Sequence, residues 1–106
     1  MHFVVVSHDK PGMAETRARV RPAHLDYMQK SRPPARHIIG MPLSTDDEST
    51  MIGSLAIVEA PDRATVEAFA KGDPYAQAGI FASTEIFAIH PAFAEGSLKR
   101  ILPKPE

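Results

Sequence analysis

Apolar residues in this chain gather in four short runs that are rich in β-branched and aromatic side chains and end in polar or turn-forming residues. Runs of this kind predict β-strands, because such side chains fit a pleated surface, whereas glycine, proline and aspartate interrupt it. The predicted strands are residues 2–8, 36–43, 51–60 and 83–90. The polar, acidic residues 44–50 predict a loop between the second and third strands.

The clearest helix is predicted over residues 61–72. Asp62 is its N-cap and Gly72 closes it. The side chains expected on its buried face are Ala64, Ala68 and Phe69. One short extra turn of helix follows over residues 73–79, "DPYAQAG", with Asp73 as its cap and a proline at the first helical position.

The earlier helical segment contains a proline and is predicted in two parts. Residues 14–20 form a short helix or a helical lead-in. A helix then restarts over residues 21–31 with Pro22 at its first position, where a missing N–H group is tolerated. It stops before Pro33 and Pro34, which cannot continue it.

The resulting order of elements is strand, helix, strand, strand, helix, strand. This order predicts an α+β, ferredoxin-like βαββαβ fold, in which the helices cover one face of a four-stranded antiparallel sheet. Residues 1–106 fit a single domain, whose C-terminal tail (93–106) suggests a short strand near residues 98–102. The uncovered face of the sheet still carries valine, isoleucine and phenylalanine, which favours a homodimer formed through the two sheet faces.

Composition and charge exclude several classes of function. Twelve basic and thirteen acidic residues give a net charge of −1, so nucleic acid is not an expected partner. The absence of cysteine excludes disulfides, thiolate catalysis and cysteine-ligated metals. No run approaches the ~20 apolar residues of a membrane span, and the start "MHFVVVSHDK" resembles a strand, so we expect a cytoplasmic protein with no membrane partner. Motifs for an activated serine, a P-loop and a Rossmann cofactor site are also absent.

His24 is the strongest candidate for chemistry among the five histidines. The other four lie at or near strand ends, where surface histidines are common: His2, His8, His37 and His90. No two histidines have the i, i+4 spacing of a helical metal site, so no metal is expected. Met28 lies almost one turn below His24, which puts the histidine at the edge of the apolar stripe of its helix. This pattern alone favours a half-buried packing histidine over a general base in a cleft.

A histidine that acts as a base needs a carboxylate to orient its ring. Asp26 points elsewhere on the same helix, Asp62 is occupied as a cap, and the loop acids at residues 46–48 are expected to be solvated. Asp73 follows the second helix, which packs beside the first in this fold. The backbone N–H groups that Asp73 caps would also hold its carboxylate in place, so the same residue can cap a turn and orient His24.

Three arginines precede the histidine at intervals of two residues. Arg17, Arg19 and Arg21 do not share one face of a helix, so at least two are expected to be solvated, and one to reach an anionic or enolic oxygen beside the histidine. Gly53 in the third strand predicts a close backbone approach to a ligand or to a dimer partner. The segment "GMPL" at the end of the second strand is typical of a tight turn that leaves the strand. The residues expected to line the site are Pro42 from this segment, Ser54 and Tyr75.

Four segments together resemble the YciI-like (YCII-related) family: "RARVRPAHLDYM", "GMPL", "AFAKGDPYAQAGIF" and "HPAF". The resemblance covers residues 2–93, and the combination of RPxHL with DPYxxAG is its most specific part. It implies a ferredoxin-like fold that dimerises through its sheets into an α/β barrel, and a His–Asp dyad that falls on His24 and Asp73. The family includes a dehydrochlorinase acting on a chlorinated hydroxyhydroquinone, and muconolactone isomerase-like proteins share the fold. The chain departs from the family at "SRPPAR", which shortens the helix at the mouth of the cleft.

We therefore predict a small enzyme without a cofactor. His24 takes a proton from a phenolic or enolic hydroxyl of a small organic substrate, and Asp73 orients the imidazole. Arg17, or with weaker support Arg21, binds the developing oxyanion. This chemistry fits a lyase of the dehydrochlorinase type or an isomerase. A non-catalytic dimer that binds or senses a small molecule, with a purely structural dyad, is the alternative, and a haem- or metal-dependent monooxygenase is a third hypothesis.

Overall fold

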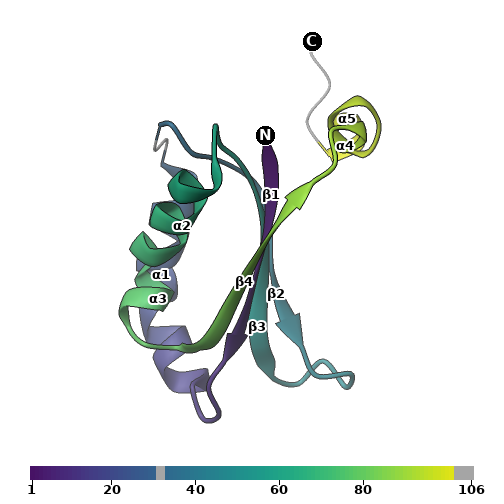
Figure 1. Ribbon diagram of the computed structural model, residues 1–106. Coiled ribbons are helices and arrows are strands. Elements are labelled where there is room, and N and C mark those ends of the chain that lie inside the picture. Colours follow the sequence, from purple (N-terminus) through teal and green to yellow (C-terminus); the bar gives the residue numbers. More distant parts are fainter. Residues whose placement is uncertain (31–32, 102–106) are drawn as a thin grey trace.

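The computed structural model describes residues 1–30 and 33–101, which fold around one four-stranded antiparallel sheet (Figure 1). The strands lie in the spatial order β2-β3-β1-β4 and are β1 (His2–Asp9), β2 (Arg36–Ser44), β3 (Met51–Glu59) and β4 (Phe81–Ile89). Three helices cover one face of the sheet: α1 (Ala14–Gln29), α2 (Arg63–Gly72) and α3 (Pro74–Gln77). The predicted α+β, ferredoxin-like fold is confirmed.

Alternation along the central strand β1 separates the two faces of the sheet. Phe3, Val5 and Ser7 are buried under the helices, opposite three residues of β3: Val58, Ala56 and Ser54. Val66 and Phe69 of α2 complete this core. The helix-covered face therefore changes from apolar to polar toward the end of β1, and the candidate site forms at that polar end.

The first helix is continuous, so the predicted restart at Pro22 is wrong. α1 runs from Ala14 to Gln29 with Pro22 inside it. A proline removes the hydrogen bond to the carbonyl four residues earlier, which here belongs to Ala18. Ala18 and Pro22 are both exposed, so water can solvate that carbonyl and the helix tolerates the loss. The predicted extension as far as Ser31 lies outside the described residues.

The second helix begins as predicted but buries a different set of side chains. The Asp62 carboxylate accepts a hydrogen bond from the Thr65 N–H at 2.8 Å. Val66 and Phe69 are buried, whereas of the three predicted side chains only Phe69 is: Ala64 and Ala68 are exposed. Val66 and Phe69 are three positions apart and so lie on the same face of the helix. Burying their larger apolar surface is more favourable than burying that of the alanines, so this face packs against the sheet.

The C-terminal segment is helical, so the strand predicted near residues 98–102 is wrong for its described part. α4 (Ala92–Glu95) and α5 (Ser97–Ile101) follow β4 and lie on the side of the sheet away from α1–α3 (Figure 1). The α5 sequence "SLKRI" contains good helix formers and only one β-branched residue, which explains the outcome. Leu98 anchors the segment by burial, and the Phe93 ring contacts His2 edge-on. Residue 102 lies outside the described part of the chain.

The face of the sheet opposite α1–α3 carries apolar side chains. Val4 and Val6 alternate with the buried residues of β1, and their neighbours across the sheet include Ile57 and Phe87. Phe87 is 51% exposed and Met41, farther across the sheet, is 41% exposed. Such a face is the one on which we predict dimerisation. Within the described residues, none of the helices is long and apolar enough to span a membrane.

Candidate functional site

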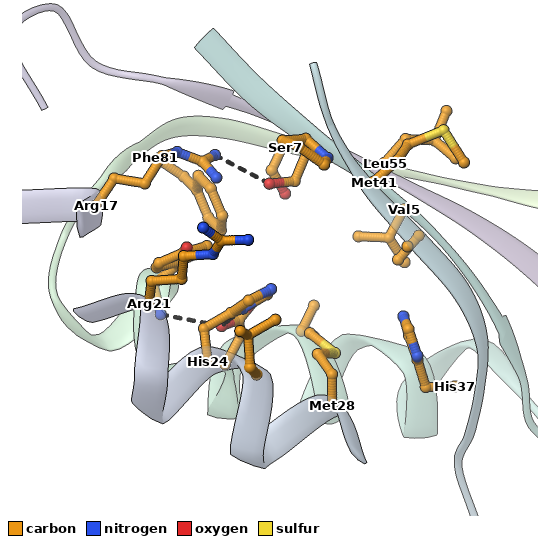
Figure 2. A pocket seen from close by; sticks show the side chains of 18 of the residues that line it. Val5, Ser7, Arg17, Arg21, His24, Met28, His37, Met41, Leu55 and Phe81 are labelled. Atoms are coloured by element: carbon orange, nitrogen blue, oxygen red, sulfur yellow. Dashed lines mark hydrogen bonds and ion pairs between the residues drawn. The ribbon is translucent and has the colours of Figure 1, made fainter. Parts of the chain in front are cut away.

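A cavity of about 150 Å³ lies between the helices and the polar end of the sheet (Figure 2). Most of its wall is apolar, with side chains from β1, α1 and β4 that include Val5, Met28 and Phe81. An engineered apolar cavity of about this volume holds a benzene molecule, so the space suits a single small ring. The residues predicted for the site from the sequence all line it: Arg17, Arg21, His24, Pro42, Ser54, Asp73 and Tyr75.

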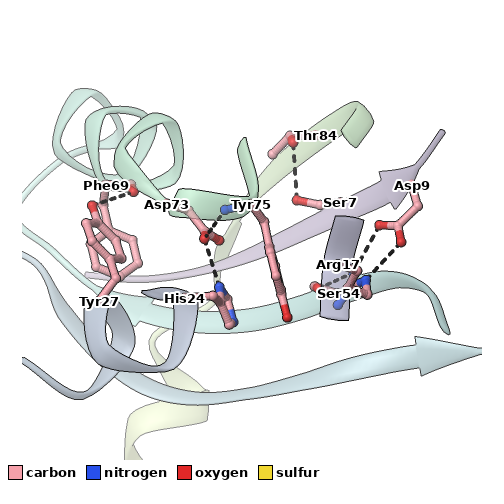
Figure 3. Close-up of polar contacts among 10 residues, drawn as sticks. All are labelled: Ser7, Asp9, Arg17, His24, Tyr27, Ser54, Phe69, Asp73, Tyr75 and Thr84. Atoms are coloured by element: carbon pink, nitrogen blue, oxygen red, sulfur yellow. Dashed lines mark hydrogen bonds and ion pairs between the residues drawn. The ribbon is translucent and has the colours of Figure 1, made fainter. Parts of the chain in front are cut away.

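His24 and Asp73 are in direct contact at one side of this cavity (Figure 3). The His24 Nδ1 atom lies 2.8 Å from the Asp73 Oδ1 atom, and the Tyr75 N–H donates to the same oxygen at 2.9 Å. Since a carboxylate oxygen accepts, Nδ1 carries the proton and the lone pair of the neutral imidazole is on Nε2. Nε2 has no hydrogen-bond partner among the described residues, so it is available to a ligand.

Two local features hold this pair in place. Asp73 is the N-cap of α3, with Pro74 at the first helical position, so its side chain is tied to the backbone of its own turn. On the other side, Gly72 lets α1 approach closely, because a Cβ atom there would lie 2.5 Å from the Tyr27 hydroxyl oxygen. That hydroxyl donates to the Phe69 carbonyl at 2.8 Å. His24, one turn before Tyr27 on α1, is thereby positioned against Asp73.

The Tyr75 ring extends the site from the dyad toward Arg17. It stacks on the His24 ring with the centroids 4.0 Å apart and the planes 10° apart. The Arg17 guanidinium carbon lies 4.6 Å from the Tyr75 ring centre, and Figure 3 shows the ring between His24 and Arg17. Burial raises the pKa of the Tyr75 hydroxyl, although the positive charge of Arg17 opposes the shift. The phenol is therefore a neutral hydrogen-bond donor near pH 7.

Arg17 is buried and paired rather than free. Its Nε and Nη2 atoms donate to the two carboxylate oxygens of Asp9 at 2.9 Å, and Nη2 also donates to the Ser54 hydroxyl at 2.9 Å. Burial alone would lower the pKa of Arg17, but the hydrogen bonds and negative charge of Asp9 outweigh it and raise the pKa. Arg21, one turn later, is exposed at the cavity and has no ion pair with another described residue.

The sequence analysis did not identify Asp9, which follows the predicted end of the first strand at residue 8. The signal that could have found it is the alternation of β1, because Asp9 continues the inward-facing series of Phe3, Val5 and Ser7. A carboxylate at the buried end of such a series needs a cation, and a nearby arginine supplies one. Gly53 is a position of close backbone approach, but the approach that the structure shows is to the neighbouring strand β1 and not the predicted one to a ligand or dimer partner: a Cβ there would overlap the Ser7 carbonyl oxygen.

His37 was also missed, since it was grouped with the histidines of strand ends. It is half-buried and lines the cavity from β2 (Figure 2). Burial lowers the pKa of the His37 imidazole, and positive charge on His24 lowers it further, whereas the charge of Asp73 opposes the shift. Its strand register pairs it with the buried Val58, which turns it toward the helices. No group of three or more histidine, aspartate or glutamate side chains suited to a metal ion occurs in the described part of the chain.

Comparison with known proteins places this arrangement in context. The family model of the YCII-related domain matches residues 1–90. The chain is 31% identical over 86 residues to the protein YciI of Escherichia coli O6:H1, covering 76% of this chain and 88% of that protein, and the same values hold for YciI of Shigella flexneri. Among solved structures it is similar to the 5-chloro-2-hydroxyhydroquinone dehydrochlorinase of Burkholderia phenoliruptrix AC1100 in complex with 2,5-dihydroxybenzoquinone. The TM-score is 0.73 at 30% identity, with 85% of this chain and 94% of that chain covered.

Proposed function

The chain belongs to the YCII-related family, and we propose that it is a small enzyme that uses His24 and Asp73 for acid–base chemistry on a hydroxylated ring. The observation that carries the proposal is the 2.8 Å contact between Nδ1 and Oδ1 at the wall of a ring-sized cavity. The contact leaves Nε2 free to take a proton from a ring hydroxyl. Asp73 holds the imidazole in the required tautomer and stabilises the imidazolium that forms.

The reaction class we propose is the loss of hydrogen chloride from a chlorinated hydroxyhydroquinone, and a proton shift of an enol is the simpler variant. The dehydrochlorinase that shares 30% of the sequence supports this class. General acid–base catalysis contributes about 10²–10⁴-fold to a rate, which suffices for an activated hydroxyquinol. The chloride leaves with the bonding electron pair, so the reaction needs no external oxidant or reductant.

The arginines have different roles in this proposal. Because Asp9 compensates the charge of Arg17, we assign Arg17 a positioning role. Its guanidinium lies against the Tyr75 ring beside the dyad and donates a hydrogen bond to the Ser54 hydroxyl. Arg21 has no ion pair with another described residue, and its positive charge at the cavity stabilises the oxyanion that develops when the hydroxyl loses its proton. Pro42 and Ser54 form part of the wall and confine the ring.

We also propose that two copies associate through the outer face of the sheet. Phe87 and Met41 are large, exposed and apolar on that face, beside the outward-facing Val4 and Val6. An uncovered apolar sheet face is stabilised by a second copy of itself in a two-fold dimer. Sedimentation or light scattering of the purified protein tests this, and a monomer at micromolar concentration would contradict it.

The function is tested with a panel of small compounds. Purified protein is incubated with 5-chloro-2-hydroxyhydroquinone and with lactone-type compounds, and the reaction is followed by the absorbance of the products. Binding of 2,5-dihydroxybenzoquinone is measured in parallel by calorimetry. Turnover of the chlorinated ring by the wild type but not by His24→Ala supports the enzyme. Equal inactivity of the two proteins, with both still binding the quinone, would identify a binding module instead.

A further inference from the structure

We propose that His37 is a second proton-transfer residue of this pocket, acting on the oxygen at the end of the ring opposite to the one that His24 serves. The inference rests on the proposed function, because it assigns a role within the same reaction. It also defines the substrate class more closely: a single ring with oxygens at two opposite positions.

The two histidines enter the cavity from different layers of the fold. His24 comes from α1 on the helical side, and His37 comes from β2 in the sheet (Figure 2). Figure 2 shows the two histidine side chains on separate parts of the wall that lines the cavity. The proposal places a planar ring in this cavity of about 150 Å³ with one edge toward each imidazole.

The His37 side chain has no role in holding the fold together through polar contacts. Neither of its ring nitrogens has a hydrogen bond or an ion pair with another described residue, although the side chain is half-buried. Half-buried polar groups are normally paired, so a nitrogen directed into a cavity without a protein partner is available to a ligand. His24, in contrast, already uses one nitrogen for Asp73.

The strand backbone provides space for the His37 ring. Gly40 lies three residues later on β2, and a Cβ atom there would be 2.7 Å from the His37 Nε2 atom. A larger residue would displace the imidazole. Opposite Gly40 on β3 stands Ala56, another small residue, so the floor of the cavity is open where the His37 ring lies.

Dehydrochlorination of such a ring involves proton transfer at two oxygens. The hydroxyl beside the chlorine loses its proton, its oxygen becomes a ketone, and the carbon that bears chlorine forms a C–H bond. The hydroxyl at the opposite end then loses its proton and forms the second ketone. The ring double bond shifts, and the C–Cl bond breaks with its electrons on chloride. Two protons leave oxygens and one is added to carbon, so the products are a quinone, one proton and one chloride.

These steps are divided between the two imidazoles. His24, oriented by Asp73, moves the proton from the first hydroxyl to the adjacent carbon. His37 accepts the proton from the opposite hydroxyl, for which it must be neutral. The lowered pKa of His37 is consistent with this role, and the charged groups on the elements facing it are His24, Arg21 and Asp73.

The test measures chloride release from 5-chloro-2-hydroxyhydroquinone by the wild type, His24→Gln, His37→Gln and His37→Ala. His37→Gln is expected to lose about 10²-fold in kcat with KM changed less than threefold, and added imidazole to restore part of the rate of His37→Ala. His90→Gln, at an exposed position away from the cavity, is the matched control and keeps the wild-type rate. Circular dichroism and thermal unfolding of each variant verify the fold.

The outcomes separate the two proposals. If His24→Gln is inactive while His37→Gln keeps the wild-type kcat, the role of His37 is wrong and the proposed function stands. A variant that loses rate only through KM, without rescue by imidazole, would also overturn proton transfer by His37. If the wild type itself releases no chloride, both proposals fail.

Discussion

Removing the Asp9 carboxylate tests whether the Arg17–Asp9 pair supports the site in the way the structure indicates. The side chains of Arg17 and Asp9 are only 4% and 5% exposed, and two hydrogen bonds of 2.9 Å join them. In Asp9→Ala the guanidinium stays buried without its counter-ion. Breaking a buried pair in this way costs about 3–5 kcal/mol.

The magnitude is large relative to the stability of such a domain. About 5–15 kcal/mol separates a typical folded domain from its unfolded state, so the variant would lose a substantial fraction. At about 4–8 °C per kcal/mol for a domain of this size, Tm is expected to fall by at least about 12 °C. Urea unfolding at pH 7 gives the free energy of unfolding, and calorimetry gives Tm.

Two matched variants make this experiment specific. Asp26 forms an exposed i, i+4 pair with Lys30, whose side chain is 65% exposed, so Asp26→Ala is expected to cost only about 0.3–0.5 kcal/mol. The double variant Asp9→Ala with Arg17→Met removes both charges and is expected to recover much of the loss, because no charge then remains buried. A loss of stability in Asp9→Ala no larger than that in Asp26→Ala would show that the Arg17–Asp9 pair does not support the site.

Three further outcomes are expected. Asp73→Asn keeps an oxygen for the Tyr75 N–H but removes the charge that stabilises the imidazolium, so kcat falls about 10²-fold while Tm changes little; equal kcat values in a turnover assay would contradict this. Gly72→Ala places a Cβ against the Tyr27 hydroxyl and lowers Tm, and the loss is smaller in a Tyr27→Phe background, as calorimetry of the four proteins would establish. Hydrogen bonds from Thr45 and Ser49 lower the pKa of Asp47 from 3.8 to about 2. The ionised Asp47 carboxylate therefore stabilises the fold above pH 3.8, and this stabilisation is lost as the pH falls toward 2. An NMR titration of the Asp47 carboxyl with a midpoint near 3.8 would contradict the lowered pKa.

Local patterns were sufficient for the four strands and for the N-caps of α2 and α3. The strand runs, the cap at Asp62 and the cap at Asp73 depend on residues within a few positions of each other, so the sequence expresses them directly. The contact between His24 and Asp73 joins residues 49 positions apart. It was predicted because helix packing in the fold class places these segments together and because the family resemblance names the pair.

Features that depend on strand register or on solvent exposure were not predictable in the same way. His37 faces inward because of how β2 aligns with β3, and the sequence around it does not indicate that direction. Asp9 continues the alternation of β1, but it lies one residue beyond the predicted end of that strand. Proline normally interrupts a helix, yet α1 continues through Pro22. The sequence does not show that Pro22 and Ala18 are exposed to solvent, where water can replace the lost hydrogen bond. α5 is helical because helix formers dominate its sequence and only one of its residues favours a strand.

In the proposed reaction, the imidazole of His24, held by Asp73, removes a proton from the substrate. The most direct measurement of this step is the rate of chloride release from 5-chloro-2-hydroxyhydroquinone under single-turnover conditions, with wild-type protein and with His24→Gln. We expect release by the wild type and a rate about 10²–10⁴-fold lower in the variant, with both proteins folded. Chloride release by His24→Gln at the wild-type rate would contradict it.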